Sequence, residues 1–287
     1  MPEEWLTEAA RARARIPTTV VFQQRWRLAV RLLRQVRASG IRVTAVLADA
    51  EFGDTRMFRA LLHRSRLPYA VAVSTPLRAF LGTPRLMAPR AAPGSHQRRL
   101  APGVVARPFV DLLAAARPRW RRVRWRNRRD GRQWAADWAA IRVTPALDSR
   151  HPRLSPEIWL LAERDVGRQA KTRYSYVNLP ETASLAQIAR LAHQRWAIEQ
   201  QYQELKTELG LDHFEGRTFP GWHHHVVLTA LTYNFLQAER RRRIPTALSF
   251  PRSRRPSRQL PARLQRTVRA WLQVRVNSRP IDERTVR

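Results

Sequence analysis

Residues 195–206 read RWAIEQQYQELK, and this stretch is the most informative part of the chain. On a helix that turns about 100° per residue, Arg195, Glu199 and Lys206 fall within roughly 40° of one another. This face offers one carboxylate flanked by two cations, which suits a metal-binding acid beside a phosphodiester. A separate apolar stripe predicts the side that packs on a core, and it consists of Ile198, Tyr202, Leu205 and Leu209.

A second candidate acid, Asp49, ends a mostly apolar run at 41–48 that is rich in β-branched residues. Such a run predicts a short buried strand. Two-metal phosphoryl transfer uses several carboxylates around Mg²⁺ ions about 3.5–4 Å apart, and strand ends and helix faces can supply them rigidly. In this scheme Arg195 orients Glu199 or holds a phosphate, and Lys206 contacts the DNA backbone as a point charge.

Each of these features also has a purely structural interpretation. An aspartate followed by Gly53 and Asp54 is, in isolation, more often part of a turn. A glutamate four residues after Arg195 is usually a solvated helix pair worth about 0.2–0.5 kcal/mol. The joint pattern, rather than either residue alone, indicates a site.

The composition points to a polyanionic partner. The 287 residues include 54 Lys and Arg against 22 Asp and Glu, a formal charge of +32. Abundant Arg, Ala and Pro indicate codon bias, but this bias does not explain the excess of bases over acids, so we expect nucleic acid as the partner. The sequence has no cysteine, no signal-peptide pattern and no apolar run of about 20 residues. We therefore expect a cytoplasmic protein with no membrane partner.

Hydrophobic periodicity predicts an α/β core followed by β-rich sequence. Helices are expected at 19–38 and 55–65, and buried strands at 41–48 and 69–73. Residues 76–118 show no sustained period and predict a loop. A hairpin is expected next, in which 120–126 pairs with 134–143 through a turn at Asp130 and Gly131. Two more strand-like segments follow at 158–162 and 174–179.

Two helices and a basic tail complete the chain. A capping box of Ser184 and Gln187 begins a helix of about 25 residues that Gly210 ends. A second helix covers roughly 222–242, with Val226, Val227, Leu231, Phe235 and Leu236 on the side expected to be buried. From Glu239 to Arg287 there are 15 arginines and three acids, with a short helix plausible at 258–273.

These motifs resemble one branch of the bacterial insertion-sequence transposases, which are DDE enzymes with a ribonuclease-H-like core. The signature of the branch is Y-(2)-R-(3)-E-(6)-K, and Arg195, Glu199 and Lys206 match it in type and spacing, while Ala192 replaces the tyrosine. Three further stretches resemble the same branch: ADAEFGD at 48–54, LGLDHFEGR at 209–217 and GWHHH at 221–225.

The resemblance implies an architecture and a partner. It implies an incomplete ribonuclease-H-like core interrupted by a β-rich insertion, divided as 1–76 (first part of the core), 77–180 (insertion), 181–242 (second part of the core) and 243–287 (basic tail). It also implies Asp49 and Glu199 as catalytic acids that bind Mg²⁺ (or Mn²⁺). Double-stranded DNA is the implied partner, at element ends and target, and a homodimer on DNA is expected.

One catalytic acid of this family has no counterpart in the sequence. Family members carry a first Asp on the first core strand, but before Asp49 this chain offers only Glu3, Glu4 and Glu8. We therefore expect a transposase that lacks its N-terminal part and is inactive and poorly stable alone. Two alternatives stay open. One is a non-catalytic DNA-binding remnant or inhibitor. The other is a structural nucleic-acid protein, which fits the charge but not the motif spacing.

The remaining basic and aromatic features suggest DNA contacts. Residues 117–132 contain nine arginines and one acid, and we expect Arg121, Arg124 and, from the resembling segment, Arg217 to bind DNA. Trp125 could stack on an unpaired base, although packing within a solvated β-ribbon is its simpler role. Neighbouring helical side chains diverge by about 100°, so the three histidines at 223–225 are expected to pack or contact phosphate rather than share a metal ion.

Overall fold

The computed structural model describes residues 7–87, 99–126, 133–146, 155–166 and 171–243. These residues divide into two compact units. The first unit holds the described residues between 17 and 200, and the second holds 7–16 and 201–243. The basic tail after residue 243, with its expected helix at 258–273, lies outside the described residues.

Within the described residues, the first unit contains all of the strands and most of the helices. Its helices are α2 (Arg25–Ala38), α3 (Ala50–Gly53), α4 (Arg56–Arg64), α5 (Phe109–Ala116), α6 (Leu185–His193) and the start of α7 (Trp196–Thr207). Its strands are β1 (Val46–Ala48), β2 (Tyr69–Val73), β3 (Arg78–Leu81), β4 (Leu86–Met87), β5 (Arg99–Leu100), β6 (Arg107–Pro108), β7 (Arg121–Arg126), β8 (Gln133–Pro145), β9 (Ile158–Asp165) and β10 (Thr172–Asn178). The second unit contains α1 (Glu8–Arg13), the rest of α7 and α8 (Phe219–Arg243).

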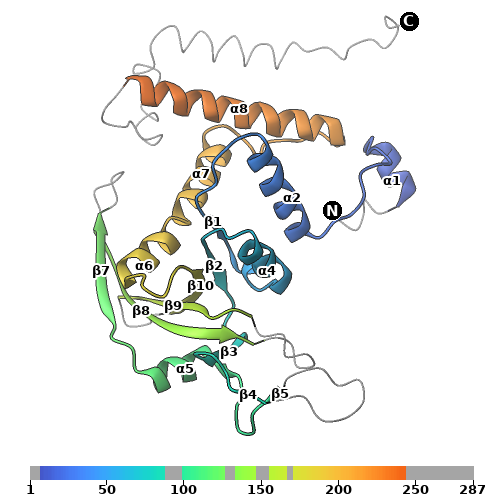
Figure 1. The fold of residues 1–287 in the computed structure, drawn as a ribbon. Coiled ribbons are helices and arrows are strands. Elements are labelled where there is room, and N and C mark those ends of the chain that lie inside the picture. The colour runs from blue at the N-terminus through green and yellow to red at the C-terminus, as the bar shows by residue number, and fades with distance from the viewer. Residues whose placement is uncertain (1–6, 88–98, 127–132, 147–154, 167–170, 244–287) are drawn as a thin grey trace, which may run out of the picture. The chain divides into compact units, whose positions relative to one another are not determined.

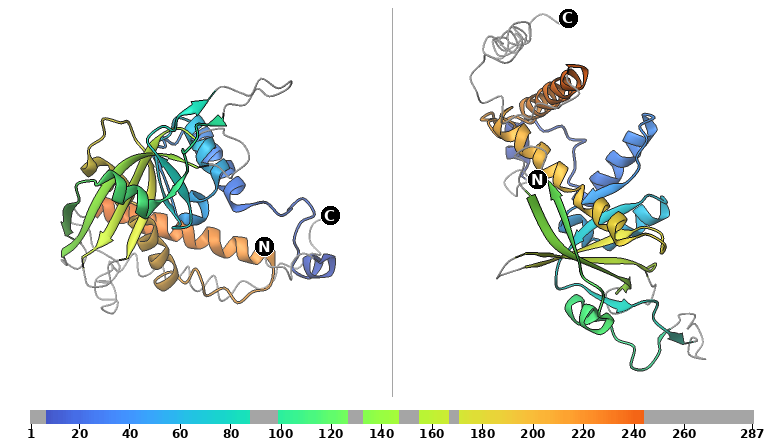
Figure 2. Two further views of the ribbon diagram at one scale, coloured as in Figure 1. Left: turned by 90° about the horizontal axis from the view of Figure 1, so that it is seen from below. Right: turned by 90° about the vertical axis from the view of Figure 1, so that its left-hand side faces the viewer.

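Eight of the strands form one mixed sheet in the order β1-β2-β10-β9-β8-β3-β6, with β7 pairing to β8. Among the strand pairs of the described residues, β1 and β2 are parallel and the other pairs in this sheet are antiparallel, with one isolated parallel bridge between Gly82 and Val143. Figures 1 and 2 show the strong twist of these strands. The predicted α/β class is confirmed, and the arrangement is consistent with a ribonuclease-H-like fold.

The segment expected to be a β-rich insertion shares this sheet with the first part of the core. Strand β10 pairs directly with β2, with Tyr176 opposite Val71, and β9 and β8 continue the sheet from there. The predicted hairpin is present as β7 and β8, although its turn at 127–132 lies outside the described residues. The four-part division of the chain stays a prediction.

Alternating side chains on the strands send two apolar layers to opposite faces of the sheet. Val71, Leu160 and Tyr176 lie in the layer that α2, α4 and α5 cover. Ala70 and Val177 lie in the layer that α6 covers through its buried residues Ile188 and Ala189. The helices on both faces are visible in Figure 1. This two-faced burial explains why β2 reads as a continuous apolar run.

The first strand and its neighbouring helix leave apolar surface exposed. Of the expected strand at 41–48, only the last three residues pair, and β1 has no second strand partner among the residues described. On α2, Val30 is buried against the sheet, but Leu28, Leu32 and Val36 are exposed. Their spacing of four residues places them along one side of the helix.

The expected loop at 76–118 is wrong in part, because it contains the helix α5 and four short strands. Phe109 and Leu112 on α5 are almost fully buried in the larger core. The helix begins directly after Pro108 and has an apolar sequence, FVDLLAAA, of only eight residues. Such a short run gives little periodic signal in the sequence, and packing on the sheet stabilises it.

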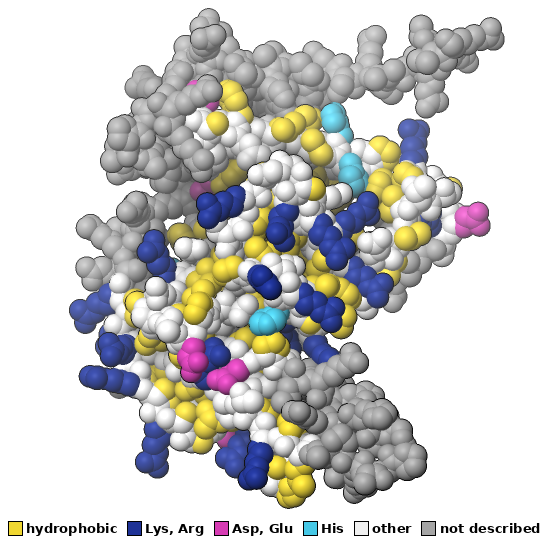
Figure 3. Space-filling model, viewed as in Figure 1, with side chains coloured by type: hydrophobic (Ala, Val, Ile, Leu, Met, Phe, Trp, Pro, Cys, Tyr) yellow, Lys and Arg dark blue, Asp and Glu magenta, His cyan; other side chains and the backbone are white. Residues whose placement is uncertain are grey.

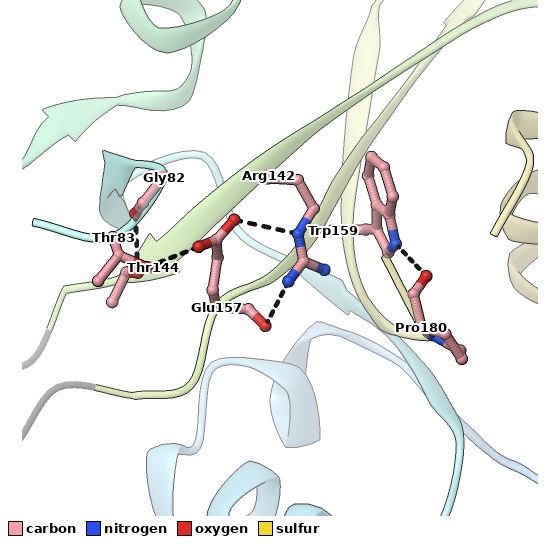
Figure 4. Close-up of polar contacts among 7 residues, drawn as sticks. All are labelled: Gly82, Thr83, Arg142, Thr144, Glu157, Trp159 and Pro180. Carbon is pink, nitrogen blue, oxygen red and sulfur yellow. Dashed lines mark hydrogen bonds and ion pairs between the residues drawn. The ribbon is translucent and has the colours of Figure 1, made fainter. Parts of the chain in front are cut away.

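A polar cluster ties the segment after β3 to strands β8 and β9 (Figure 4). Arg142 on β8 donates from Nε to Oε1 of Glu157 at 3.1 Å and from Nη2 to the Glu157 carbonyl at 3.1 Å. Thr83 donates its hydroxyl to the other carboxylate oxygen of Glu157 at 2.6 Å. Thr144 donates to the carbonyl of Gly82 at 2.8 Å. The segment is therefore fixed by side chains where strand pairing ends.

The single 25-residue helix expected after Ser184 is wrong, because it is divided into α6 and α7. The capping box itself is confirmed. The backbone amide of Gln187 donates to Oγ of Ser184 at 3.3 Å, and the backbone amide of Ser184 donates to Oε1 of Gln187 at 2.8 Å. Between the helices, the amides of Arg195 and Ile198 bond to carbonyls three residues earlier, at 3.2 and 3.0 Å. These tighter 3₁₀-type bonds interrupt the α-helical ladder.

The apolar stripe expected to seat α7 on a core is also not buried. Ile198 is 39% exposed and Tyr202 is 55% exposed, and α7 has no fully buried residue. Helical spacing reveals which side chains share a face, but it does not determine whether another element covers that face.

In the second unit, α8 packs through a different side from the one expected. His225 and Thr229 are buried, whereas Val227, Leu231 and Phe235 are exposed, so the prediction is wrong for these three. His225 Nε2 lies 3.0 Å from the carbonyl oxygen of Gly210, in the segment after α7. This contact ties the buried side of α8 to the segment that follows α7.

The same unit joins segments that are far apart in the sequence. The Phe219 amide at the start of α8 donates to the carbonyl of Ala14, after α1, at 2.7 Å. The Tyr233 hydroxyl lies 3.3 Å from Oε2 of Glu204 on α7. Within the described ranges, no helix is both long enough and apolar enough to span a membrane.

Candidate active site and nucleic-acid interface

Asp49 stands at the carboxyl end of β1, where the chain turns into the one-turn helix α3. It is the N-cap residue of α3, and its carbonyl accepts the Gly53 amide at 2.8 Å. Its side chain is exposed and makes no capping hydrogen bond to α3. An aspartate used for turn chemistry would bond a nearby amide. The carboxylate of Asp49 is instead free to meet a ligand.

Glu199 lies in the first turn of α7 and pairs with Arg195 in the turn before that helix. Arg195 Nη1 lies 2.5 Å from Oε1 of Glu199, and their side chains are 35% and 55% exposed. The two side chains therefore meet, as expected for residues four apart, even though the helix is interrupted between α6 and α7. The glutamate carboxylate has one charged partner and otherwise faces solvent.

The structure brings some of the predicted residues into the same unit and separates others. Asp49, Arg195 and Glu199 belong to the first unit. Lys206 and Arg217 belong to the second unit, and both side chains are exposed.

The described acids do not by themselves make a complete metal site. Across the part of the chain that the structure describes, no three His, Cys, Asp or Glu side chains are grouped so that they could hold a metal ion. Two-metal chemistry needs several converging carboxylates, and Asp49 and Glu199 supply two. These two residues alone therefore do not fit a two-metal centre.

Two of the three consecutive histidines make ring contacts within the second unit. His223 stacks on Phe219 with ring centroids 4.0 Å apart, and its Nδ1 lies 3.0 Å from the Phe219 carbonyl oxygen. His225 is buried, and its ring lies against Phe214 with centroids 5.4 Å apart. His224 is exposed. The expected packing is thus seen for His223 and His225, and the expected phosphate contact stays a prediction.

The predicted DNA-binding arginines of β7 lie on two faces of the sheet. Arg121 and Arg124 are both exposed, but three residues apart on a strand they point in opposite directions. Arg122, on the same face as Arg124, donates from Nε to Oδ1 of Asp137 at 2.9 Å. This hydrogen bond lowers the pKa of the Asp137 carboxyl, and Arg164 adds a second positive charge 3.8 Å away. Arg122 is thus partly neutralised, while Arg121 and Arg124 have no ion-pair partner among the described side chains.

Aromatic residues accompany these arginines. The backbone of Trp125 pairs opposite Trp134 in the β7–β8 hairpin, but the Trp125 side chain lies outside the described part of the structure. The guanidinium of Arg164 stacks over Trp120 at 4.4 Å from the ring centroid, a contact that the sequence did not indicate. Figure 3 shows Lys and Arg side chains distributed widely over the visible face, with few acidic ones.

A set of contacts around α3 was not predicted from the sequence. Gly53 packs so tightly on β2 that a Cβ atom there would lie 1.8 Å from the Ala72 carbonyl oxygen. Asp54 accepts the backbone amide of Ser74 on Oδ1 at 2.9 Å. Arg59 on α4 is buried and donates from Nη1 to the carbonyl of Gly53. The pair Gly53-Asp54 is a recognisable turn signal, but nothing in the sequence marks Arg59 among 52 arginines.

The mixed sheet, the exposed carboxylate after β1 and the Arg–Glu pair at the start of α7 can now be compared with known families. Residues 1–132 match a family model described as DDE superfamily endonuclease. This match covers less than half of the chain and includes β1 and Asp49, and it supports the predicted DDE type. Glu199 lies beyond the matched residues, and the Y-R-E-K branch and the missing N-terminal part stay predictions. No curated protein matches the chain.

Proposed function

We propose that the chain is a polypeptide of a DDE-type transposase, an enzyme class that nicks DNA at the ends of an insertion sequence and joins the new 3′-hydroxyl to target DNA, and that this copy is inactive alone. The observation that carries this proposal is Asp49, which lies in the DDE-matched region with a carboxylate that no residue of α3 engages. Glu199 in the same compact unit supplies the second acid. DNA is the substrate class of this superfamily.

The proposed roles of the charged side chains follow from their surroundings. Asp49 and Glu199 are the acids that face the reacting phosphodiester. Arg195 holds Glu199 in place at 2.5 Å and has further donors for a phosphate oxygen. Lys206 and Arg217 are exposed and contact the DNA backbone, as do Arg121 and Arg124 of β7.

Nucleases of the DDE superfamily generally use divalent metal ions, and we assign Mg²⁺ or Mn²⁺ as the ion. With two carboxylates instead of the expected three, the chain should hold such an ion weakly. Of the three acids before Asp49, Glu3 and Glu4 lie outside the described residues, and Glu8 is in the first turn of α1 in the second unit. The proposal is therefore that this chain alone does not cleave DNA.

The partners proposed are element ends and target DNA, both double-stranded. Bringing two ends together calls for two copies of the enzyme, so a homodimer on DNA is part of the proposal. Because the substrate is bacterial DNA, the proposed location is the cytoplasm, with the protein on the nucleoid when bound.

A second candidate function is a non-catalytic DNA-binding remnant or an inhibitor of an active transposase. Exposed arginines without ion-pair partners among the described side chains, such as Arg124 on β7, favour retained DNA binding. Such binding would fall steeply with salt, because it depends on release of counterions from phosphates.

One experiment tests what both candidates predict for this chain alone, which is DNA binding without cleavage. Supercoiled DNA is incubated with the full chain and Mg²⁺ or Mn²⁺, and nicking and binding are measured for wild type, Asp49→Asn, Glu199→Gln and the control Glu181→Gln, which changes an exposed acid before α6. Binding without nicking is the expected result. Nicking that Asp49→Asn and Glu199→Gln abolish, but Glu181→Gln does not, would overturn the inactivity and establish catalysis. Failure to bind DNA would overturn both candidate functions.

A further inference from the structure

Arg59 is the only charged residue that is buried in the described part of the chain, and it has no carboxylate within hydrogen-bonding distance there. It lies on α4, and burial lowers the pKa of its guanidinium. Placing a cation in a core is costly unless its donors are satisfied. A residue that carries such a cost in the fold calls for a specific role.

The partners of Arg59 all lie around the helix that follows Asp49. Its Nη1 donates to the carbonyl of Gly53, the last residue of α3. Its guanidinium lies over the ring of Tyr176 on β10, 5.3 Å from the centroid. A cation is favourable at a helix C-terminus, where backbone carbonyls lack partners. Arg59 thus joins α4, the end of α3 and the central sheet.

Helix α3 has only four residues, so its own hydrogen bonds cannot hold it. Three further contacts fix it: Gly53 packs against the Ala72 carbonyl, Asp54 accepts the Ser74 amide at 2.9 Å, and Glu51 pairs with Arg25 at 2.7 Å. Two of these contacts and the Arg59 bond converge on residues 53 and 54. The Gly53 amide in turn bonds to the carbonyl of Asp49 at 2.8 Å.

We infer that Arg59 is a positioning residue, whose buried guanidinium locks α3 onto the sheet and so fixes the direction of the Asp49 carboxylate. The inference rests on the proposed function, which makes Asp49 an acid of the DNA-processing site. Arg59 touches no substrate; it acts through the Gly53 carbonyl and the short helix between that carbonyl and Asp49. Supports of this kind hold reacting groups in place when the element carrying them is too short to be rigid alone.

The alternative is that Arg59 only stabilises the core. The two roles differ in what a substitution disturbs. Loss of a stabilising residue accelerates global unfolding and affects α3 and the central strand β2 equally. Loss of a positioning residue opens α3 selectively and changes the environment of the Asp49 side chain while β2 remains protected.

The test compares Arg59→Met with Arg64→Met in the full chain. Arg64 is on the same helix but exposed, so its variant controls for the loss of one charge from α4. Two readouts are taken by NMR: hydrogen exchange at the Gly53 and Asp54 amides relative to Val71 on β2, and the carboxyl signal of Asp49. The chain has nine aspartates, so selective ¹³C labelling resolves this signal, and Asp49→Asn assigns it.

We expect Arg59→Met to speed exchange at Gly53 and Asp54 by roughly tenfold or more relative to Val71, as for loss of a hydrogen bond from a charged donor. The Asp49 carboxyl signal should shift, and Arg64→Met should change neither readout. Equal acceleration at all three amides with an unchanged Asp49 signal would overturn the inference.

If Arg59→Met does not fold, Arg59→Lys serves as the second variant, because it keeps the charge but not the forked guanidinium. Arg59→Lys should also speed hydrogen exchange at Gly53 and Asp54 relative to Val71, but by a smaller factor. Unchanged exchange at these two amides would overturn the inference. Neither readout uses DNA processing, so failure of the proposed function would appear separately, as an absence of DNA binding by the wild-type chain.

Discussion

Arg195 and Glu199 form an ion pair of 2.5 Å across the junction between α6 and α7. Arg195 lies in the turn and Glu199 in the first turn of α7, so the pair bridges the point where the helical hydrogen bonds change register. Their side chains are 35% and 55% exposed. Water screens such a pair, so its contribution to stability is small even though its geometry is good.

For this reason Glu199→Gln should lower the free energy of unfolding by less than about 1 kcal/mol. Urea denaturation of wild type and variant measures the difference. A decrease of several kcal/mol would mean that Glu199 is mainly a structural residue, and would weaken its assignment to a DNA-processing site.

Gly53→Ala should be far more damaging. The added methyl group would lie 1.8 Å from the Ala72 carbonyl oxygen, so α3 must move away from β2. We expect a loss of about 3 kcal/mol, at the upper end of the usual cost of overpacking.

The control for this change is Gly40→Ala. Gly40 has a φ of +81°, but a methyl group added there would meet no atom within 4 Å, so only backbone strain of about 1–2 kcal/mol is expected. Comparable losses in the two variants, measured by thermal or urea unfolding, would contradict a steric clash at Gly53.

Ser184→Ala should remove the capping box and cost about 1 kcal/mol. Oγ of Ser184 accepts the Gln187 amide at the start of α6, the helix that covers one face of the sheet. Ser65→Ala is a suitable control, since the Ser65 hydroxyl only donates to the Leu61 carbonyl at an exposed helix end. Equal effects of the two substitutions on the unfolding midpoint would argue against the cap.

His193 makes stability depend on pH. Burial on α6 lowers the pKa of this imidazole below 6.5, although the charge of Glu163 acts in the opposite direction. Between the lowered pKa of the folded state and the ordinary value of 6.5, the folded state therefore binds fewer protons than the unfolded state. The contribution of His193 is complete above about pH 6.5 and is lost as the pH falls through that value.

The measurement is the unfolding midpoint of wild type and His193→Gln between about pH 5 and pH 7.5. Wild type should lose more stability than the variant on acidification. A parallel pH dependence of the two proteins would assign the loss to other groups.

Replacing an arginine of β7 that is unpaired among the described residues should weaken DNA binding more than replacing an arginine that forms ion pairs with acidic side chains. Arg124 has no described ion-pair partner, so Arg124→Gln should reduce the slope of log affinity against log salt by about 0.9 if it contacts one phosphate. Arg173 pairs with Glu163 and Asp165 at 3.1 and 2.6 Å, so Arg173→Gln should leave the slope nearly unchanged. A larger effect at Arg173 would place the DNA contact elsewhere on the sheet.

Much of the fold could be predicted from local sequence. The expected helix at 55–65 and strand at 69–73 correspond to α4 and β2, and the predicted hairpin corresponds to β7 and β8. Ser184 and Gln187 form the predicted capping box. These features depend on residues close together in the chain, whose propensities and hydrogen bonds the sequence specifies directly.

The candidate site was predictable only in part. The spacing of Arg195 and Glu199 identified a pair that is present, because residues four apart meet on one helical turn. Arg59 could not be identified, because its role depends on the Gly53 carbonyl and on the ring of Tyr176, which is more than a hundred residues away in the sequence.

The sequence by itself determined the basic charge, the alternation of helices and strands, and the local motifs around Asp49 and Glu199. Only the tertiary structure decided that β10 pairs with β2, that α7 leaves Ile198 and Tyr202 exposed, and that α8 packs through His225. The physical reason is that periodicity determines which side chains share a face of an element. Which face becomes buried depends on contacts with distant segments, and no local pattern specifies these.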